Sequence, residues 1–172
     1  MNTLELLHRL TAQLHRRGHT VTCAESCSGG LLAAELTRLP GSSAWFESSF
    51  VTYSNRAKQT LLNVQAASLH QYGAVSEVVV REMATGAQAV THADYALAIS
   101  GIAGPSGGST DKPVGTVWFA LVHPHGIDSE CCHFTGERDV VRAQSVLHAL
   151  AMLAACLQKD GENGLQPDTE SL

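Results

Sequence analysis

The chain has 172 residues, of which 44% are hydrophobic and 16% are charged, and its formal net charge is −5. This length suits one domain, and the composition excludes a disordered, collagen-like or coiled-coil protein. The acidic balance argues against a broad nucleic-acid-binding surface, although a local basic pocket for a small anion remains compatible with it.

The sequence also bears on the compartment and on metals. It contains no run of about eighteen apolar residues, and no basic stretch precedes an apolar one near Met1, so neither a membrane span nor a secretory signal is expected. The five cysteines lack the spacing of a disulfide framework or a zinc site, which indicates a cytoplasmic protein. The histidines form no metal-binding motif, so no metal or cofactor is expected.

The first third of the chain predicts helices and strands in alternation. Leucines at helical spacing predict a helix over residues 3–17. A short β-favouring segment over residues 21–24 predicts a buried strand. A turn at 26–30 and a helix over 31–39 follow, since Pro and Gly come next and end a helix. The later half of 44–53 is rich in aromatic and β-branched residues and predicts a second strand.

The middle of the chain predicts three helices. Ser54 or Asn55 is expected to cap a short helix that carries Lys58. Further helices are predicted over residues 66–72 and 77–90, the second on the strength of apolar residues at helical spacing.

The last part predicts three strands and a long helix. A strand over 95–100 leads into a glycine-rich loop at 101–108. Strands over 115–122 and 129–134 are joined by a turn, which predicts a hairpin. A helix over 137–157 closes the folded part.

These elements predict an α/β domain, and the hairpin makes its sheet mixed and not wholly parallel. Residues 1–158 are expected to form this single domain. Residues 159–172 carry mostly acidic charges and are expected to form a disordered tail.

The turn at 24–30, with sequence AESCSGG, follows a strand and opens a helix. Such a turn presents free backbone N–H groups and the positive end of a helix dipole, so a serine in it can lie beside an anion or oxyanion site. The alternative is that Ser26 or Ser28 is a helix cap and that the glycines only permit a tight turn.

Lys58 lies in a mostly apolar stretch between aromatic strand residues and a pair of leucines. A lysine held in such a pocket has a lowered pKa, because burial disfavours the charged form, and the neutral amine can take a proton from a serine. Tyr53 could hydrogen-bond across such a pair. The alternative is a surface lysine on a short helix, with Tyr53 as an ordinary strand aromatic.

Two further features could contact a ligand. The loop over 100–109 follows a strand, where α/β folds place ligand loops, and glycines let a backbone approach a ligand closely. Arg138 and Arg142 lie four residues apart, hence on one face of the last helix, and such a pair can hold a phosphate. A flexible connection and a solvated helix face are the alternatives.

Six segments carry a family resemblance when taken in order. They are AESCSGG at 24–30, GSSAWFESSFVTYSNRAK at 41–58, GAVSE at 73–77, SGIAGPSGG at 100–108, KPVGTVWFA at 112–120 and FTGERDVVR at 134–142. Together they resemble the CinA C-terminal family, and most closely its stand-alone nicotinamide-nucleotide amidases. The resemblance covers about residues 4–157.

The resemblance implies a three-layer α/β/α sandwich around a mixed, mostly parallel sheet. It implies hydrolysis of nicotinamide mononucleotide to nicotinate mononucleotide and ammonia, which recycles pyridine nucleotides toward NAD without a metal or another cofactor. The matching positions are Ser26 as nucleophile, Lys58 as its base and Tyr53 as a supporting group. The residues expected to contact the substrate are Cys27, Ser28, Gly29, Gly30, Ser100, Gly101, Gly104, Gly108 and Arg142.

Some alternatives stay open. The family usually has threonine where this chain has Ser28, so Ser28 and the neighbouring Cys27 are also candidate nucleophiles. The chain could act on another small amide, or be a non-catalytic nucleotide-binding or competence-related module. Longer CinA proteins carry a further N-terminal hydrolase domain, whose activity is not expected here. A homo-oligomer that binds a small molecule, and neither nucleic acid nor membrane, is the expected assembly.

Overall fold

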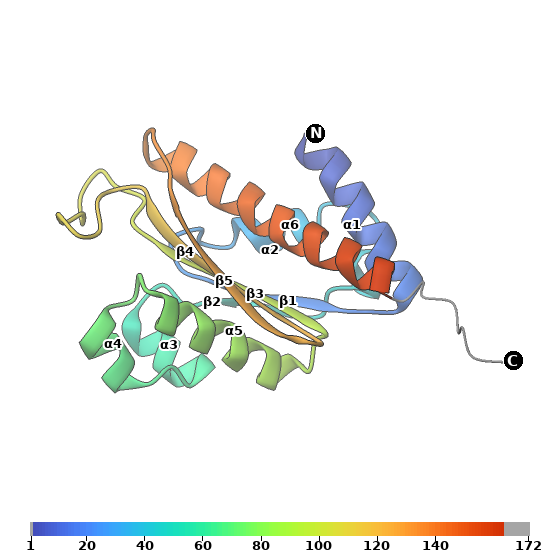
Figure 1. The fold of residues 1–172 in the computed structure, drawn as a ribbon, viewed down its shortest axis with the longest axis horizontal. Helices are drawn as coiled ribbons and strands as arrows, with labels where there is room; N and C mark the ends of the chain where they lie inside the picture. The colour runs from blue at the N-terminus through green and yellow to red at the C-terminus, as the bar shows by residue number, and fades with distance from the viewer. Residues whose placement is uncertain (1, 164–172) are drawn as a thin grey trace, which may run out of the picture.

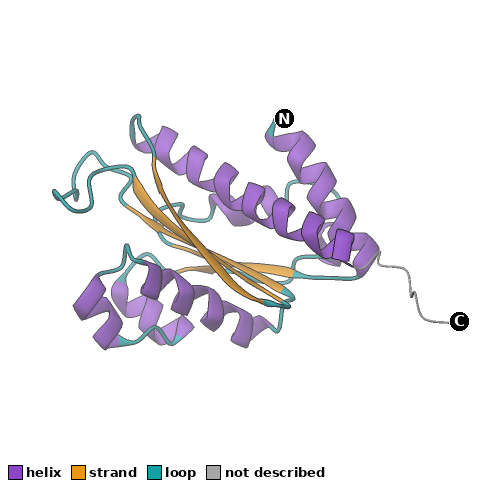
Figure 2. Ribbon diagram, in the orientation of Figure 1, coloured by secondary structure: helices purple, strands orange, loops and turns teal. Residues whose placement is uncertain are grey.

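The computed structural model describes residues 2–163. In chain order its elements are α1 (Thr3–Arg17), β1 (Val21–Glu25), α2 (Leu31–Leu36), the 3-10 turn η1 (Ser42–Ala44), β2 (Phe50–Val51), α3 (Asn55–Leu62), α4 (Ala66–Tyr72), α5 (Glu77–Thr91), β3 (Tyr95–Gly101), β4 (Thr116–His123), β5 (Gly126–His133) and α6 (Arg138–Asn163). They form three layers, with α1, α2 and α6 on one face of the sheet and α3, α4 and α5 on the other (Figure 1, Figure 2).

The strands of the described residues form one five-stranded sheet in the order β2-β1-β3-β4-β5. Strand β1 is parallel to both β2 and β3, whereas β4 is antiparallel to β3 and β5. Only β4 is therefore reversed, and the predicted mixed, mostly parallel sheet is confirmed. Because β1 and β3 are adjacent and parallel, their carboxyl ends meet at one edge, which is where α/β folds bind ligands.

The two faces of the sheet carry side chains of different size. On β3, Tyr95, Leu97 and Ile99 point into the core formed with α1 and α6. On the other face, Ala98 and Ala120 belong to the core formed with α5. Small side chains on that face let α5 pack close to the sheet.

Helix α5 also holds α3 in place through a backbone contact. A Cβ atom built on Gly86 of α5 would lie 2.0 Å from the carbonyl oxygen of Leu62, the last residue of α3. Only glycine allows this approach. The contact matters for the site because α3 carries Lys58.

Helix α2 is shorter than predicted, since it ends at Leu36 and not at residue 39. The indole Nε1 of Trp45 donates a hydrogen bond of 2.8 Å to the carbonyl oxygen of Leu36, which satisfies a helix-end acceptor. In addition, Leu39 precedes Pro40, and the residue before a proline disfavours helical geometry.

Two strands also differ from the predicted lengths. Strand β2 is limited to Phe50–Val51, where it pairs with the end of β1. Strand β5 begins at Gly126, three residues before the predicted residue 129, because the tight turn pairs His123 directly with Gly126.

The last helix is longer than predicted. It continues to Asn163, so the expectation of a disordered tail from residue 159 is wrong over 159–163. Tertiary contacts explain the extension: Arg17 Nη2 donates to the carbonyl oxygen of Leu157 at 2.6 Å, and the Tyr95 hydroxyl donates to Asp160 Oδ2 at 2.8 Å. The rest of the predicted tail, 164–172, lies outside the described residues.

Among the described helices, α6 is long and apolar enough to cross a bilayer by length and composition alone. Half of its apolar stretch is buried inside the protein, and it packs on α1 and on the sheet. These features are typical of a core helix in a folded domain.

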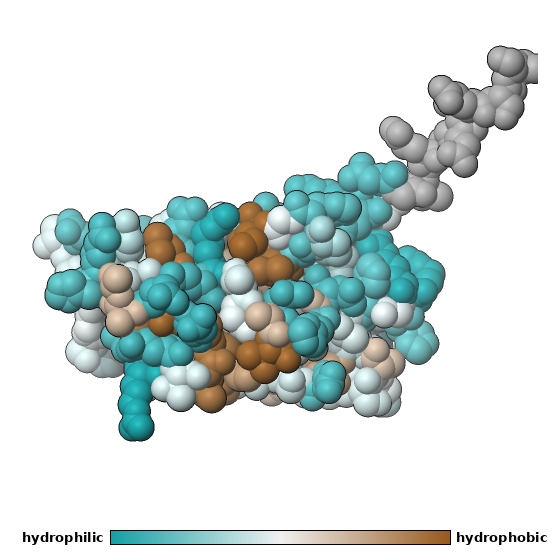
Figure 3. Space-filling view, turned by 90° about the horizontal axis from the view of Figure 1, so that it is seen from below, coloured by the Kyte–Doolittle hydropathy of each residue, from teal (hydrophilic) through white to brown (hydrophobic). Residues whose placement is uncertain are grey.

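Hydrophobic side chains reach the surface among polar ones on the side of α3, α4 and α5 (Figure 3). Leu61 of α3, Tyr72 of α4 and Val90 of α5 are exposed. The homo-oligomer expected from the sequence stays a prediction. The exposed apolar side chains of this face are available for contact with a second copy of the chain.

We predict that Gly86→Ala destabilises the protein by roughly 1–3 kcal/mol or more, because the added methyl group forces α5 away from the backbone of α3. Urea unfolding at equilibrium measures the effect. The matched control is Val90→Ala in the same helix, where the side chain is 57% exposed. Its expected effect lies between no change and a gain of about 1 kcal/mol. Equal stability of the two variants would contradict the proposed contact.

Candidate active site

A serine and a lysine meet at the carboxyl edge of β1. Ser26 directly follows β1, and Lys58 lies in the first turns of α3. The Lys58 Nζ atom lies 2.9 Å from the Ser26 Oγ atom, although the two residues are 32 positions apart. Ser26 is 9% exposed and Lys58 only 1%, so the amine is held inside the protein.

Two backbone carbonyls orient the lysine amine. The carbonyl oxygen of Thr52 lies 2.7 Å from Lys58 Nζ, and that of Tyr53 lies 3.5 Å away. A neutral amine has two N–H donors and one lone pair, so two carbonyl acceptors turn the lone pair toward Ser26. Burial lowers the pKa of Lys58 from 10.5 to about 8, since it disfavours the charged form. The amine can therefore accept the serine proton near neutral pH.

The turn after Ser26 depends on glycine. Gly29 and Gly30 have φ values of +60° and +104°, a region that favours glycine. The turn is closed by the Gly29 N–H, which donates to the Ser26 carbonyl oxygen at 3.1 Å. Within the described residues, the N–H of the fully buried Ser28 has no hydrogen-bond partner.

The amino end of α2 is already occupied by a side chain of the protein. The buried Glu25 carboxylate accepts hydrogen bonds from the N–H groups of Leu32 at 2.9 Å and Ala33 at 3.0 Å. A carboxylate is favourable there because it complements the helix dipole. The N–H groups of Leu32 and Ala33 are therefore already paired, and an oxyanion would have to use N–H groups of the turn before them.

The two other candidate nucleophiles are placed less favourably than Ser26. Burial raises the pKa of the Cys27 thiol to about 11, so the thiolate is scarce at neutral pH. The Ser28 Oγ atom is buried without a hydrogen-bond partner in the described structure and does not line the cavity beside Ser26.

The dyad opens into a cavity of about 280 Å³. The residues expected from the sequence that line it are Ser26, Cys27, Tyr53, Lys58, Ser100, Gly101 and Gly104. The expected residues that do not line it are Ser28, Gly29, Gly30, Gly108 and Arg142. Asn55, Ala74 and Val75 also line the cavity and had not been indicated by the sequence. Arg138 and the loop residues Ile102, Ala103, Ser106 and Gly107 line it too, and the sequence had indicated them only as part of an arginine pair and of a possible ligand loop.

Arg138 joins two walls of the cavity. Its Nη1 donates to the Gly104 carbonyl oxygen and its Nη2 to the Tyr53 hydroxyl, both at 2.8 Å. Tyr53 is 58% exposed, so its hydroxyl belongs to the cavity mouth and the arginine, while its main chain faces the lysine. The four-residue spacing from Arg142 indicated a functional arginine pair, but spacing alone did not tell which member faces the cavity.

Two glycines of the loop after β3 serve the packing of the loop itself. A Cβ atom on Gly104 would lie 2.5 Å from Val114 Cγ1, and one on Gly108 would lie 2.8 Å from the Val114 nitrogen. These glycines let the loop fold back on its own second half. The loop thereby forms a fixed wall of the cavity.

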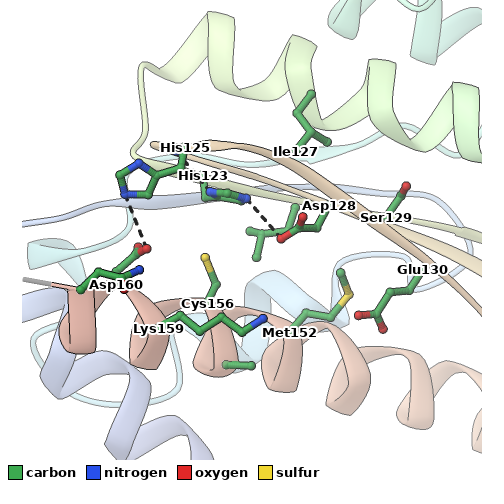
Figure 4. A pocket seen from close by; sticks show the side chains of 13 residues that line it. His123, His125, Ile127, Asp128, Ser129, Glu130, Met152, Cys156, Lys159 and Asp160 are labelled. Atoms are coloured by element: carbon green, nitrogen blue, oxygen red, sulfur yellow. Dashed lines mark hydrogen bonds and ion pairs between the residues drawn. The ribbon is translucent and has the colours of Figure 1, made fainter.

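A larger cavity, of about 590 Å³, lies between the β4–β5 hairpin and the end of α6 (Figure 4). Asp128 Oδ2 lies 3.2 Å from His123 Nε2, which makes no hydrogen bond in the described structure, and Asp160 Oδ1 lies 3.7 Å from His125 Nε2. Cys156 also lines this cavity, and burial raises the pKa of its thiol to about 11. Across residues 2–163, no group of three or more His, Cys, Asp or Glu side chains is arranged to hold a metal.

Comparison with known proteins finds relatives that are similar over most of the chain. The chain is 53% identical over 152 residues to the nicotinamide-nucleotide amidohydrolase PncC of Escherichia coli K12, which covers 87% of this chain and 92% of that protein. It is 51% identical over 145 residues to the protein of the same name from Pseudomonas putida, covering 84% and 91%. It also matches a putative competence-damage inducible protein of Symbiobacterium thermophilum at 50% identity, but spans only 35% of that longer protein.

Solved structures show the same fold. A CinA superfamily protein of Klebsiella pneumoniae 700603 superposes with a TM-score of 0.88 at 43% identity, covering 92% of this chain and 99% of that one. The competence damage-inducible protein A of K. pneumoniae MGH 78578 gives a TM-score of 0.89 at 41% identity, covering 92% and 98%. The family model of the CinA C-terminal domain matches residues 3–157. The chain therefore belongs to the CinA C-terminal domain family.

Proposed function

We propose that this protein hydrolyses the carboxamide of nicotinamide mononucleotide, giving nicotinate mononucleotide and ammonia in the recycling of pyridine nucleotides toward NAD. The contact of 2.9 Å between Lys58 Nζ and Ser26 Oγ inside a cavity carries the proposal. The names of relatives that share about half of its residues supply the substrate. The cytoplasm, expected from the cysteine content, is the proposed location.

The first half of the reaction forms an acyl-enzyme. Ser26 Oγ attacks the carboxamide carbon while neutral Lys58 takes the hydroxyl proton. Backbone N–H groups of the turn at 27–30 that have no partner among the described residues stabilise the oxyanion, and each such donor is worth roughly 3–4 kcal/mol in comparable sites. The C–N bond then breaks, and protonated Lys58 returns its proton to the departing ammonia.

The second half releases the acid. Lys58, neutral again, takes a proton from a water molecule that attacks the ester carbon. The ester bond to Ser26 breaks, Ser26 Oγ regains its proton from Lys58, and the carboxylate product leaves. The single lysine thus acts as base and acid in each half, which suits a pKa close to neutral pH.

Arg138 is the proposed partner of the substrate phosphate. It lies at the cavity mouth, and its guanidinium has donors beyond the two that bind Gly104 and Tyr53. Arg142, the residue expected for this role from the sequence, instead donates to the Cys27 carbonyl oxygen and does not line the cavity. The carboxamide would then lie against Ser26, with the phosphate toward solvent.

The main rival is an amidase for another small amide. The cavity wall formed by Ala74, Val75, Ile102 and Ala103 would accept many flat apolar rings. Ammonia release from nicotinamide, nicotinamide riboside and nicotinamide mononucleotide, each at several concentrations, separates the two functions. A preference for the free amide would exclude the mononucleotide as the natural substrate.

We predict that Ser26→Ala and Lys58→Met each lower kcat by roughly 10²–10⁴-fold, because they remove the nucleophile and its base. Lys159→Met is the matched control, since it makes the same substitution at a lysine beside the separate cavity of the β4–β5 hairpin and α6, and it should keep the activity. Ammonia release is the measurement, with circular dichroism to verify folding. Normal turnover by Ser26→Ala would exclude the proposed nucleophile.

We predict that kcat/KM rises roughly tenfold per pH unit from pH 6 to 7.5 and levels off above about pH 8. The value of kcat/KM rises with pH because only neutral Lys58 accepts the serine proton, and the pKa of Lys58 is about 8. Initial rates in buffers of constant ionic strength give the profile. A flat profile between pH 6 and 9 would contradict a lysine base.

We predict that Arg138→Met raises KM for the mononucleotide by roughly 10–100-fold with little change in kcat, because a charge-assisted contact to the phosphate is lost. Nicotinamide riboside, which lacks the phosphate, is the internal control. Its kcat/KM should be unchanged by the substitution. Equal losses for both substrates would assign Arg138 to the structure of the site instead.

A further inference from the structure

We infer that Ser100 is a further catalytic residue, whose hydroxyl binds the carboxamide nitrogen that leaves as ammonia. The inference rests on the proposed function, because that nitrogen belongs to its substrate. It gives Ser100 a role in breaking the C–N bond, whereas the sequence indicated only that Ser100 contacts the substrate.

Ser100 lies beside Ser26 on the neighbouring strand. Strands β1 and β3 run parallel, and the last pair in their register joins Glu25 to Ile99. The Ser26 N–H donates to the Ile99 carbonyl oxygen at 3.0 Å, which continues this ladder by one residue. Ser26 is therefore the neighbour of Ser100, at the spacing of about 5 Å that separates paired strands.

The two serine side chains lie on the same side of the sheet. Side chains alternate along a strand, and Ala98 of β3 belongs to the core formed with α5, so Ser100 faces that side too. Helix α3 covers the same face and brings Lys58 Nζ to within 2.9 Å of Ser26 Oγ (Figure 1). Ser26, Lys58 and Ser100 all line the same cavity.

The Ser100 hydroxyl has no partner in the part of the chain that the structure describes. Ser100 is 1% exposed, and its side chain makes no hydrogen bond within residues 2–163. Leaving a buried hydroxyl unpaired is costly, so a polar group that enters the cavity gains by pairing with it. The other buried lining residues with a side-chain oxygen or nitrogen are Ser26 and Lys58, and these two already contact each other.

The reacting carboxamide needs such a partner on its nitrogen. Once Ser26 Oγ has attacked, the carbon is bonded to Oγ, and the nitrogen and the oxyanion lie one bond farther out. The proposed oxyanion donors are N–H groups of the turn at 27–30, which follows Ser26. The nitrogen is therefore left for the side of β3, where Ser100 lies.

The amine of Lys58 is already fully engaged. It contacts the carbonyl oxygens of Thr52 at 2.7 Å and Tyr53 at 3.5 Å, besides Ser26 Oγ. A charged lysine has three N–H donors, so only the one directed at Ser26 Oγ can pass to the substrate. The substrate nitrogen must turn its lone pair toward Lys58, and a hydroxyl that accepts one of its N–H bonds holds it in that orientation.

The step balances without a further reactant. The proton that Lys58 took from Ser26 moves to the nitrogen, the C–N bond breaks, and its electron pair stays on the nitrogen, which leaves as ammonia. The oxyanion restores the C=O bond of the acyl-enzyme. Ser100 accepts a hydrogen bond and neither gains nor loses a proton.

The test compares an amide with a thioester. Nicotinamide mononucleotide and the S-methyl thioester of nicotinate mononucleotide give the same acyl-enzyme, but the thioester has no N–H and its thiolate leaves without a proton. We expect Ser100→Ala to lower kcat/KM for the amide by roughly 10–100-fold and to change kcat/KM for the thioester by less than about threefold. Release of ammonia and of methanethiol are the measurements.

Two further variants sharpen the comparison. Ser100→Thr keeps a hydroxyl and should bring the ratio of the two kcat/KM values back toward that of the wild type. Ser129→Ala is the matched control, since it makes the same substitution in β5 beside the separate cavity of the hairpin and α6, and it should match the wild type. The pH profile of Ser100→Ala should still level off above about pH 8, because Lys58 remains the base.

The outcomes separate the inference from the function on which it rests. If the wild type releases no ammonia from the mononucleotide, the proposed function fails and the inference falls with it. If the wild type is active but Ser100→Ala is slowed equally on both substrates, or on neither, the inference alone is overturned. A Ser100→Thr variant with the same ratio as Ser100→Ala would also overturn it.

Discussion

The buried amine of Lys58 is the constraint on which the site depends. A charged lysine is costly inside a protein, and this one has carbonyl oxygens and a serine hydroxyl around it but no carboxylate partner within the described residues. The cost is lowered when the amine gives up its proton. The same burial that disfavours the charge thus creates a base next to Ser26, so the energetics of folding and the chemistry of the site share one cause.

The surrounding fold keeps that amine in place. Helix α3 is docked on α5 through the contact at Gly86, where the two backbones approach too closely for any side chain. The Thr52 N–H donates to the Glu25 carbonyl oxygen at 2.8 Å, which joins the segment before α3 to the end of β1. Lys58 is therefore held by a helix that is docked on α5, and Ser26 is held by the end of β1.

The turn that carries Ser26 is restrained from three sides. The Ser26 N–H donates to the Ile99 carbonyl oxygen of β3 at 3.0 Å, and the Glu25 carboxylate holds the amino end of α2. Arg142 reaches the turn from α6. These restraints come from the sheet and from the layer of α1, α2 and α6, whereas Lys58 comes from the layer on the other face. The apolar core on both sides of the sheet thus also determines the geometry of a polar site at its edge.

Much of this protein follows from local sequence. Apolar periodicity located the helices, because burial of one helix face leaves a period in the sequence, and β-favouring runs located the buried strands, because burial of both strand faces leaves a continuous apolar run. Ser26 and Lys58 were found through the family resemblance, and each also had a chemical reason to be functional. Ser54, as one of two candidate caps of α3, could be proposed from its residue type.

Other features were decided only by contacts between distant residues. Helix α6 extends to Asn163 because Arg17 and Tyr95 bind its last turns, and no local signal reports such partners. Glu25 occupies the end of α2, and Arg138, not Arg142, faces the cavity. Sequence spacing places side chains on a helix face, but the direction of that face relative to a cavity is set by the packing of whole layers. Residue types thus determined which chemistry was available, and the tertiary structure decided which groups meet.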